Sequence, residues 1–367
     1  MKKKRILVCP LDWGIGHASR DVIIIRKFLE QGNEVVLGGG GSSLKFLSSE
    51  FPHLEVIKIP SHKFFYSTIF PAWFMILIQV PAFLKGILVE HRSLKKIIDS
   101  YHIDGIISDA RYGLWNHMIP SVIITHQVRI RMPLLFRPIE FLINYINRLA
   151  LEKFSCHWIP DWQEDQNLSG KLSHKIRMPA NSSYIGCLSR FTGYLQQTEI
   201  TECFDVVILL SGPEPQRSVF EKIVTGQLVE QNRRSLIIGG LIEESPEGKQ
   251  YISSLNKRIP FITGTELHGI LISAKYIICR SGYSTIMDLV TIGKTAFLVP
   301  TPGQTEQEYL AMYLQDQGLF RYSKQGNFNL EDAIKKLDVS AVPDFRFAKN
   351  NLLDGALDLF FSGKKIS

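Results

Sequence analysis

Cysteine is scarce in this chain of 367 residues: five are scattered along it, and none form a C-x-x-C pair. This pattern excludes a disulfide framework and a zinc site, and it predicts a reducing compartment. Charged residues are also few, at 21%, against 45% hydrophobic residues, and this balance excludes a disordered chain. We therefore expect a cytoplasmic globular protein with sizeable hydrophobic cores.

Long uninterrupted apolar runs are missing as well. The basic N-terminus leads into a short apolar strand that Pro10 ends, which is too short for the core of a signal peptide. Residues 64–84 carry no charge, but Pro71 and Pro81 interrupt them, and a spanning helix needs about 20 predominantly apolar residues. We expect residues 64–84 to be either buried core or a segment lying in a membrane interface.

Positive charge, by contrast, is in excess. The formal net charge is +7 and the isoelectric point about 9.0, which favours an anionic partner such as a nucleotide, a nucleic acid or a lipid headgroup. The length exceeds the size at which one hydrophobic core keeps growing, so two domains are expected.

Short apolar strands alternate with helical segments along the whole chain, as in α/β proteins. In the first half, "RILVCP", "EVVLGGGG", "IDGIISD" and "SVIITHQ" are typical of strands, and "SRDVIIIRKFLEQG" is typical of a helix. From Asp205 the pattern restarts with "DVVILLSG", "SLIIGG", "RIPFITG", "KYIICRSG" and "TAFLVPTPG". We predict two doubly wound, Rossmann-like domains facing across a cleft, in residues 1–193 and 194–345. A C-terminal helix in residues 346–367 is expected to pack back on the first domain.

Polar or glycine-rich clusters follow many of these strands, where open α/β sheets bind their ligands. In the loop "DWGIGHASR", Gly14 and Gly16 let the backbone approach an anion or a sugar. A dinucleotide site is excluded, because Ser19 stands in place of the third glycine and the second strand ends in "LGGGG" without an acidic residue for a ribose.

Three residues at strand ends of the first half are candidate general bases: His17, Asp109 and His126. His17 would begin a helix, whose dipole favours a neutral imidazole near pH 7. Each has a structural alternative, which is helix capping or loop packing for His17 and turn formation or strand capping for the other two.

Three clusters in the second half suit a nucleotide. A glycine turn after one strand, with an arginine in the next turn, suits a diphosphate. In "RSGYSTIMDL", amides and hydroxyls gather at a helix N-terminus, and the aspartate one turn later can accept both hydroxyls of a ribose. N-capping and a favourable dipole charge are the structural alternatives. The nucleotide-side candidates are Ser211, Gly212, Arg217, Arg280, Ser281, Gly282, Ser284, Thr285, Asp288, Gln304 and Gln307.

The stretches "SGPEPQR", "CRSGYSTIMD" and "VPTPGQTEQEYLA" resemble the C-terminal domain of family 28 glycosyltransferases, a family that includes the N-acetylglucosaminyl transferase of peptidoglycan assembly and plant galactolipid synthases. "GIGHASR" is similar to the acceptor-side loop of these enzymes. The resemblance implies a GT-B fold, a nucleoside diphosphate sugar donor similar to UDP-GlcNAc, and inversion at the anomeric carbon. It also implies a glycan or lipid-linked acceptor, no nucleic acid, and neither metal nor cofactor, in agreement with the missing D-x-D motif.

Placed by this resemblance, Asp288 stands where the family has a ribose-binding glutamate, and Gln307 is the first of a Gln-Gln pair at the donor sugar. The second of that pair is Glu308 here, so the identity of the sugar stays open. The residues that the resemblance places at the donor diphosphate are Ser211, Gly212, Arg217, Ser281 and Gly282.

Two other functions stay open. "GIGHASR" also resembles the G-x-G-H-x-x-R stretch of nucleotide-sugar hydrolases of nonulosonic acid biosynthesis, in which the histidine positions a water. Those hydrolases usually have a smaller N-terminal domain, so the length favours the transferase. The other alternative is a non-catalytic protein that binds sugar nucleotides, which loss of every candidate base would support.

Residues 129–154 predict a helix with one polar stripe and a broad apolar remainder. Glu140, Asn144 and Asn147 lie in the stripe, and Arg129, Arg131 and Arg137 precede or begin the helix. Such a helix suits peripheral contact with an anionic membrane at the inner face of the plasma membrane. A helix buried in the core gives the same pattern, so both alternatives stay open.

Overall fold

The computed structural model describes residues 3–60, 72–133, 136–193, 202–242, 250–339, 343–345 and 352–361. The chain divides between Ser189 and Arg190 into two compact units, with residues 65–75 grouped with the second unit and residues 348–367 with the first. The predicted boundary at 193/194 borders residues 194–201, which lie outside the described residues, as do residues 64–71 of the uncharged stretch.

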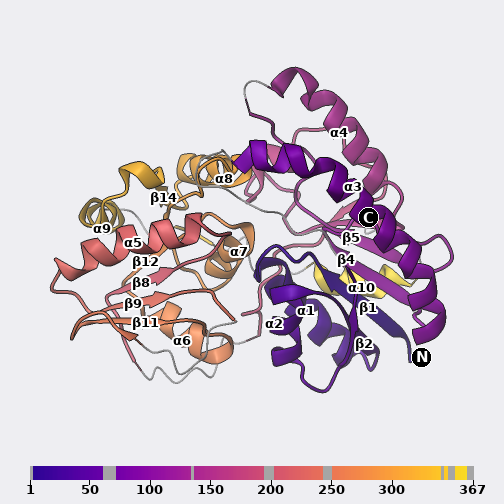
Figure 1. The fold of residues 1–367 in the computed structure, drawn as a ribbon, viewed down its shortest axis with the longest axis horizontal. Helices are drawn as coiled ribbons and strands as arrows, with labels where there is room; N and C mark the ends of the chain where they lie inside the picture. The colour runs from indigo at the N-terminus through magenta and orange to yellow at the C-terminus, as the bar shows by residue number, and fades with distance from the viewer. Residues whose placement is uncertain are drawn as a thin grey trace. The chain divides into compact units, whose positions relative to one another are not determined.

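Unit 1 is built on a sheet of seven parallel strands in the order β3-β2-β1-β4-β5-β6-β7 (Figure 1). The central strands are buried along nearly their whole length, which explains why their sequences are continuously apolar and do not alternate. The elements are β1 (Arg5–Pro10), α1 (Gly16–Glu30), β2 (Glu34–Gly39), α2 (Gly41–Glu50), β3 (Glu55–Lys58), α3 (Ala72–Tyr101), β4 (Gly105–Asp109), β5 (Ser121–Ile124), α4 (Arg137–Leu151), β6 (Cys156–Ile159), the 3₁₀ helix η2 (Gly170–Leu172) and β7 (Ser182–Tyr184).

The C-terminal helix α10 (Leu353–Phe360) also packs in unit 1 (Figure 1). The Phe360 ring lies 5.5 Å from the ring of Phe28 in α1 and 6.0 Å from that of Trp158 in β6. A Cβ on Gly105 would lie 2.7 Å from the Phe360 ring, so the absence of a side chain at the start of β4 makes room for this helix.

Unit 2 holds a second seven-stranded sheet in the order β10-β11-β9-β8-β12-β13-β14 (Figure 1). All neighbouring strands in it are parallel except β10 and β11. Its elements are β8 (Val206–Leu209), α5 (Gln216–Val229), β9 (Ser235–Ile238), β10 (Gln250–Tyr251), β11 (Asn256–Ile259), α6 (Gly264–Ser273), β12 (Tyr276–Cys279), α7 (Tyr283–Thr291), β13 (Phe297–Leu298), α8 (Thr305–Asp316), β14 (Arg321–Tyr322), η3 (Gln325–Asn327) and α9 (Leu330–Asp338).

One buried histidine makes the stability of unit 1 depend on pH. His157 in β6 is fully buried, with Nε2 bonded to the Thr125 carbonyl at 3.0 Å and Nδ1 to the Ser182 hydroxyl at 2.9 Å. Burial lowers the pKa of His157 from 6.5 to about 4. The unfolded chain therefore takes up a proton first as the pH falls, so the stabilisation present above pH 6.5 is lost between about pH 6.5 and 4.

Between pH 7 and pH 4.5, the free energy of unfolding of the wild-type protein should fall by about 2 to 3 kcal/mol more than that of His157→Gln. This difference follows from the size of the pKa shift of His157. Urea unfolding at the two pH values measures this difference. His53→Gln, at an exposed position of the same unit, should keep the wild-type pH dependence. An equal pH dependence in His157→Gln and the wild type would contradict the prediction.

Candidate functional site

The loop after β1 is held in one conformation by contacts with α2. Gly14 has φ +78°, in the left-handed region that favours glycine. Asp12 Oδ1 accepts a hydrogen bond from the Ser43 amide at 3.4 Å, and the Ser43 hydroxyl donates to the Gly14 carbonyl at 2.8 Å. A Cβ on Gly41 would lie 1.8 Å from Asp12 Oδ2, so only glycine fits there. These contacts fix the loop up to Gly16, where α1 begins.

His17 and Asp109, two of the three predicted bases, are in direct contact. His17 Nδ1 lies 2.9 Å from Asp109 Oδ1. Arg20, one turn along α1, donates from Nε to Asp109 Oδ2 at 2.6 Å and from Nη2 to Oδ1. Asp109 is fully buried and Arg20 nearly so, whereas 21% of the His17 side chain is exposed. Of these three side chains, His17 is therefore the one open to solvent.

The charges around His17 decide which ring nitrogen carries the proton. Burial raises the pKa of Asp109, but Arg20 and His17 outweigh this effect and hold it at about 2, so the carboxylate is ionised. Burial and the Asp109 charge raise the pKa of Asp21 well above its ordinary value. Arg20 Nη2, which carries two N–H groups, donates to Asp109 Oδ1 and also lies 3.0 Å from His17 Nδ1. In the tautomer whose Nδ1 proton goes to the ionised carboxylate, Nε2 of His17 is the basic nitrogen.

The third predicted base, His126, follows β5, in which Ile124 is in register with Asp109 of β4. Only 4% of His126 is exposed. Because a buried ring is poorly placed to meet an acceptor hydroxyl, His17 is the stronger candidate of the two histidines.

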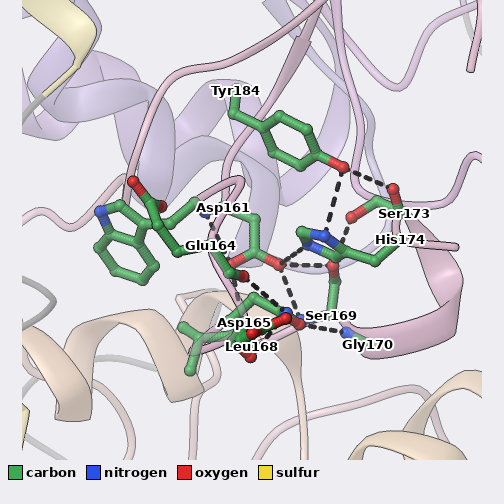
Figure 2. A network of polar contacts seen from close by, with 11 residues as sticks. Asp161, Glu164, Asp165, Leu168, Ser169, Gly170, Ser173, His174 and Tyr184 are labelled. Atoms are coloured by element: carbon green, nitrogen blue, oxygen red, sulfur yellow. Dashed lines mark hydrogen bonds and ion pairs between the residues drawn. The ribbon is translucent and has the colours of Figure 1, made fainter.

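The polar residues that follow β6 were not among the site residues expected from the sequence (Figure 2). Asp161 is fully buried, and its carboxylate accepts hydrogen bonds from the backbone amides of Trp162 at 2.9 Å, Leu168 at 3.0 Å and Ser169 at 2.8 Å. The Ser169 hydroxyl donates to the same carboxylate at 2.5 Å. One side chain thus folds the loop back on the strand end. An aspartate directly after the apolar run "CHWIP" was the available signal, the same one that marked Asp109.

His174 extends this network (Figure 2). Its Nε2 lies 3.3 Å from Asp161 Oδ2, and its ring stacks on Tyr184 of β7 with 4.9 Å between centroids. The Tyr184 hydroxyl donates to the Ser173 carbonyl at 2.7 Å. Residues 161–174 are therefore tied to both β6 and β7.

In unit 2, loops after three neighbouring strands, β8, β12 and β13, meet. A Cβ on Gly212 would lie 3.4 Å from Thr301 Oγ1, so the loops after β8 and β13 approach closely. The buried Ser281 hydroxyl, after β12, donates to the Gln307 carbonyl in α8 at 2.8 Å. The three predicted nucleotide-side clusters are thus gathered at one edge of the sheet.

The cluster after β12 forms the start of α7. Gly282 is the N-cap residue, and Ser284 and Thr285 lie in the first turn, both half-buried. A Cβ on Gly282 would meet only Thr285 Oγ1, at 3.9 Å, which leaves open space in front of the helix end. A helix N-terminus with such space favours a bound anion.

Arg280 lies at the meeting point of these loops. Its fully buried guanidinium donates to the carbonyls of Val299 at 3.1 Å and Gln216 at 2.8 Å, and lies 4.4 Å from the centroid of Phe220. Burial lowers the pKa of Arg280 to about 9. No carboxylate is paired with it within the described part of the chain. Its positive charge is therefore not neutralised by these residues.

Arg217 and Asp288, by contrast, already have charged partners. Arg217, in the first turn of α5, donates from Nε to Glu214 at 2.7 Å and from Nη1 to Glu221 at 3.0 Å. Asp288 Oδ2 accepts a bond from Arg190 Nε at 2.9 Å. Of the two predicted arginines, Arg280 is thus the better source of positive charge for an incoming anion.

The side chains of the predicted Gln-Gln position brace the loop before α8. Gln307 Oε1 accepts a hydrogen bond from the Thr301 amide at 2.9 Å, and Glu308 Oε1 from the Gly303 amide at 2.9 Å. Gln304 is the half-buried N-cap residue of α8. The Gln307 amide nitrogen remains as the polar group with which this side chain would meet a sugar.

Helix α4 is inverted relative to an ordinary surface helix. Its polar stripe faces the protein: Glu140 binds Arg129 Nε at 2.8 Å, Asn144 binds the Ile130 amide at 2.7 Å, and Asn147 binds the Val128 carbonyl at 3.0 Å. The apolar side chains are on the outside, with Phe141 75% exposed. The alternative that this helix is buried in the core is therefore wrong. Its polar side chains face inward because they bind backbone groups of the segment after β5, which leaves the apolar side chains exposed. Its exposed apolar residues are Ile139, Phe141, Leu142, Tyr145, Ile146 and Leu149.

Helix α3, which contains the described part of the uncharged stretch, also exposes apolar side chains. They are Leu77, Ile78, Val80, Leu84, Leu88 and Val89.

Within residues 3–361, as far as they are described, no helix combines the length and apolarity needed to cross a bilayer. Among the same residues, no three His, Cys, Asp or Glu side chains gather as a metal site would require.

Comparison with known proteins gives a match for the second half of the chain. Residues 224–352 match the glycosyltransferase family 28 C-terminal domain. An uncharacterized glycosyltransferase of Methanosarcina acetivorans is 23% identical over 337 residues, covering 86% of this chain and 85% of that protein. The UDP-N-acetylglucosamine–N-acetylmuramyl-(pentapeptide) pyrophosphoryl-undecaprenol N-acetylglucosamine transferase of Haemophilus influenzae is 33% identical over 85 residues, or 23% of this chain and 22% of that enzyme.

The fold is shared with solved glycosyltransferases. The calicheamicin glycosyltransferase CalG4 superposes with a TM-score of 0.66 and 11% sequence identity, covering 99% of both chains. The predicted α/β class, with two Rossmann-like sheets of the GT-B fold, is confirmed.

Proposed function

From the premise that this protein is a GT-B glycosyltransferase with a family 28 C-terminal domain, we propose that it is an inverting enzyme with a UDP-GlcNAc-like donor. It would move a hexose or an N-acetylhexosamine to a glycan or lipid-linked acceptor. The observation that carries this proposal is the buried positive charge of Arg280, two residues before the N-cap of α7, with which no carboxylate of the described residues is paired.

The donor diphosphate would bind at that point of unit 2. Transfer releases a nucleoside diphosphate, so the enzyme must stabilise negative charge that grows on the leaving oxygen. The start of α7 offers amides and a dipole, and Arg280 adds a fixed positive charge held by backbone carbonyls. Because these groups are already in place, they stabilise the leaving group without reorganisation. Ser211 and Gly212, in the loop after β8, would line the diphosphate together with Arg217 in the first turn of α5. Gln304 and Gln307 would contact the sugar.

The ribose would be recognised by Asp288, one turn further along α7. Side chains of a helix lean toward its N-terminus, so the Asp288 carboxylate points toward the end that would hold the diphosphate. Its contact with Arg190 keeps it next to a positive charge.

The acceptor hydroxyl would give its proton to His17 Nε2. The ionised Asp109 carboxylate orients the ring and stabilises the imidazolium that forms, as in other histidine bases with a carboxylate partner. The alternative is that His17 activates a water, which would make the protein a nucleotide-sugar hydrolase. The two reactions share the dyad and differ in the acceptor.

The exposed apolar side of α4 supports a lipid-linked acceptor. Exposed side chains such as Phe141 and Ile146 gain about 1.5 to 3 kcal/mol each when buried, which favours contact with a bilayer. Arg137 at the start of the helix is exposed and suits anionic headgroups. Arg129 is less suited, because Glu140 already pairs with it. We propose peripheral contact with an anionic membrane at the inner face of the plasma membrane.

An assay of UDP release with UDP-GlcNAc and other UDP-sugars tests both proposals. Release should be slow from the protein alone and at least about tenfold faster with lipid-linked acceptors in phosphatidylglycerol vesicles, because closure around both substrates excludes water. Phe141→Ser with Ile146→Ser should reduce vesicle binding by about tenfold or more, on the scale of the lost apolar burial.

The matched control is Val339→Ser, which removes an exposed apolar side chain from unit 2 and should leave vesicle binding unchanged. Rapid release of free sugar without acceptor would favour the hydrolase. Undiminished vesicle binding in the α4 variant would remove this helix from the membrane contact.

A further inference from the structure

Arg190, at the point where the chain enters unit 2, pairs with the proposed ribose residue. Its Nε donates to Asp288 Oδ2 at 2.9 Å, and both side chains are largely buried, with 13% of Arg190 and 5% of Asp288 exposed. The next residue, Phe191, is fully buried and packs 5.3 Å from the ring of His268 in α6. The Arg190 guanidinium also lies 5.2 Å from the Phe191 ring centroid. The buried Phe191 therefore fixes the backbone next to Arg190, and the ring of Phe191 and the carboxylate of Asp288 fix its side chain.

This contact reduces the electrostatic repulsion between the Asp288 carboxylate and a bound diphosphate. A carboxylate one turn from the place of a diphosphate repels it and is itself costly to bury. A guanidinium beside the carboxylate cancels both effects, because the pair has no net charge. A carboxylate accepts about four hydrogen bonds, so one bond from Arg190 does not exhaust it. The Asp288 carboxylate is therefore fixed in direction and still able to accept a hydroxyl.

The pairing also bears on the aspartate found where the resemblance places a glutamate. Asp288 is one methylene shorter and has less freedom to adjust to the ribose, so its direction must be set by a neighbour. Arg190 is in contact with it on unit 2 itself, 98 residues earlier in the sequence.

On this basis, and resting on the proposed function of Asp288, we infer that Arg190 is a positioning residue for ribose recognition. It holds the Asp288 carboxylate aimed at the ribose hydroxyls, and so makes nucleotide binding depend on the 2′-hydroxyl. Arg190 itself does not touch the reacting atoms.

Calorimetry with UDP and 2′-deoxy-UDP tests this inference. The wild-type protein should bind UDP about tenfold more tightly than the deoxy analogue, the scale of one hydrogen bond to a charged group. Asp288→Asn and Arg190→Gln should each bring this ratio close to one. Arg233→Gln removes a surface arginine paired with Glu331 at 3.7 Å in the same unit, and it should keep the wild-type ratio.

The outcomes separate the inference from the proposed function. A ratio unchanged in Asp288→Asn means that the ribose assignment, and with it the proposed donor site, is wrong. A ratio lost in Asp288→Asn but kept in Arg190→Gln leaves the proposed function standing and overturns the inference about Arg190.

The conservative variant Arg190→Lys distinguishes positioning from a purely structural role. It keeps a positive charge beside Asp288 but not the planar guanidinium that fixes the direction of the carboxylate. We expect its ratio of UDP affinity to 2′-deoxy-UDP affinity to lie between those of the wild type and Arg190→Gln. A Lys variant no better than Gln would overturn the inference.

Discussion

Replacing His17 by alanine is expected to lower turnover by about a hundredfold or more, the usual scale for loss of a general base, with donor affinity nearly intact. His17 is the solvent-open member of a buried group in unit 1, and the proposed donor residues lie in unit 2. The variant would therefore remove the proposed proton acceptor and leave the proposed nucleotide site unchanged. Steady-state kinetics together with nucleotide calorimetry measure the two effects separately.

Asp109→Asn is the companion variant. Asparagine keeps the size of the side chain, but it cannot stabilise an imidazolium and leaves the buried Arg20 without its charge partner. Turnover should fall by about tenfold or more, with an acid limb of the pH–rate profile that differs from that of the wild type. His126→Ala should leave that profile in place. Near wild-type turnover in His17→Ala, or an equal loss of donor binding, would remove His17 from the role of base.

Asp161→Ala is expected to lower the free energy of unfolding by about 3 kcal/mol or more, since each buried donor left without a partner costs about 1 to 3 kcal/mol. Three backbone amides and one hydroxyl lose their acceptor in this variant (Figure 2). The Ser169 hydroxyl keeps its contact with the Ser173 hydroxyl, so the lost bonds of the three amides make up most of the cost. Urea unfolding followed by circular dichroism gives the magnitude.

Asp165→Ala is the matched control for that experiment. Asp165 lies in the same loop and is exposed, so its loss should change the stability by no more than about 0.5 kcal/mol. A cost below about 1 kcal/mol for Asp161→Ala would show that water replaces the carboxylate, and that the loop is more open than its contacts indicate.

The candidate residues could be found from the sequence because of where they stand. Asp109, Ser211 and Ser281 each stand at or just after the end of a short apolar run, and the strand ends of a parallel sheet share one edge. The same rule applied to "CHWIPD" points to Asp161. That aspartate was missed because its strand, β6, was not among the strands expected from the sequence, and a proline separates the two.

The sequence by itself determined the fold class, the strand ends and the chemical types gathered there, because strand and helix periods are local and survive any arrangement of the elements. Only the tertiary structure decided which of those groups meet. Asp109 reaches His17 across 92 residues because β4 pairs with β1, and Arg190 reaches Asp288 across 98. The tertiary structure also turned the polar stripe of α4 inward. An amphipathic pattern fixes two opposite faces, but the unpaired backbone after β5 determined that the polar one had to face the protein.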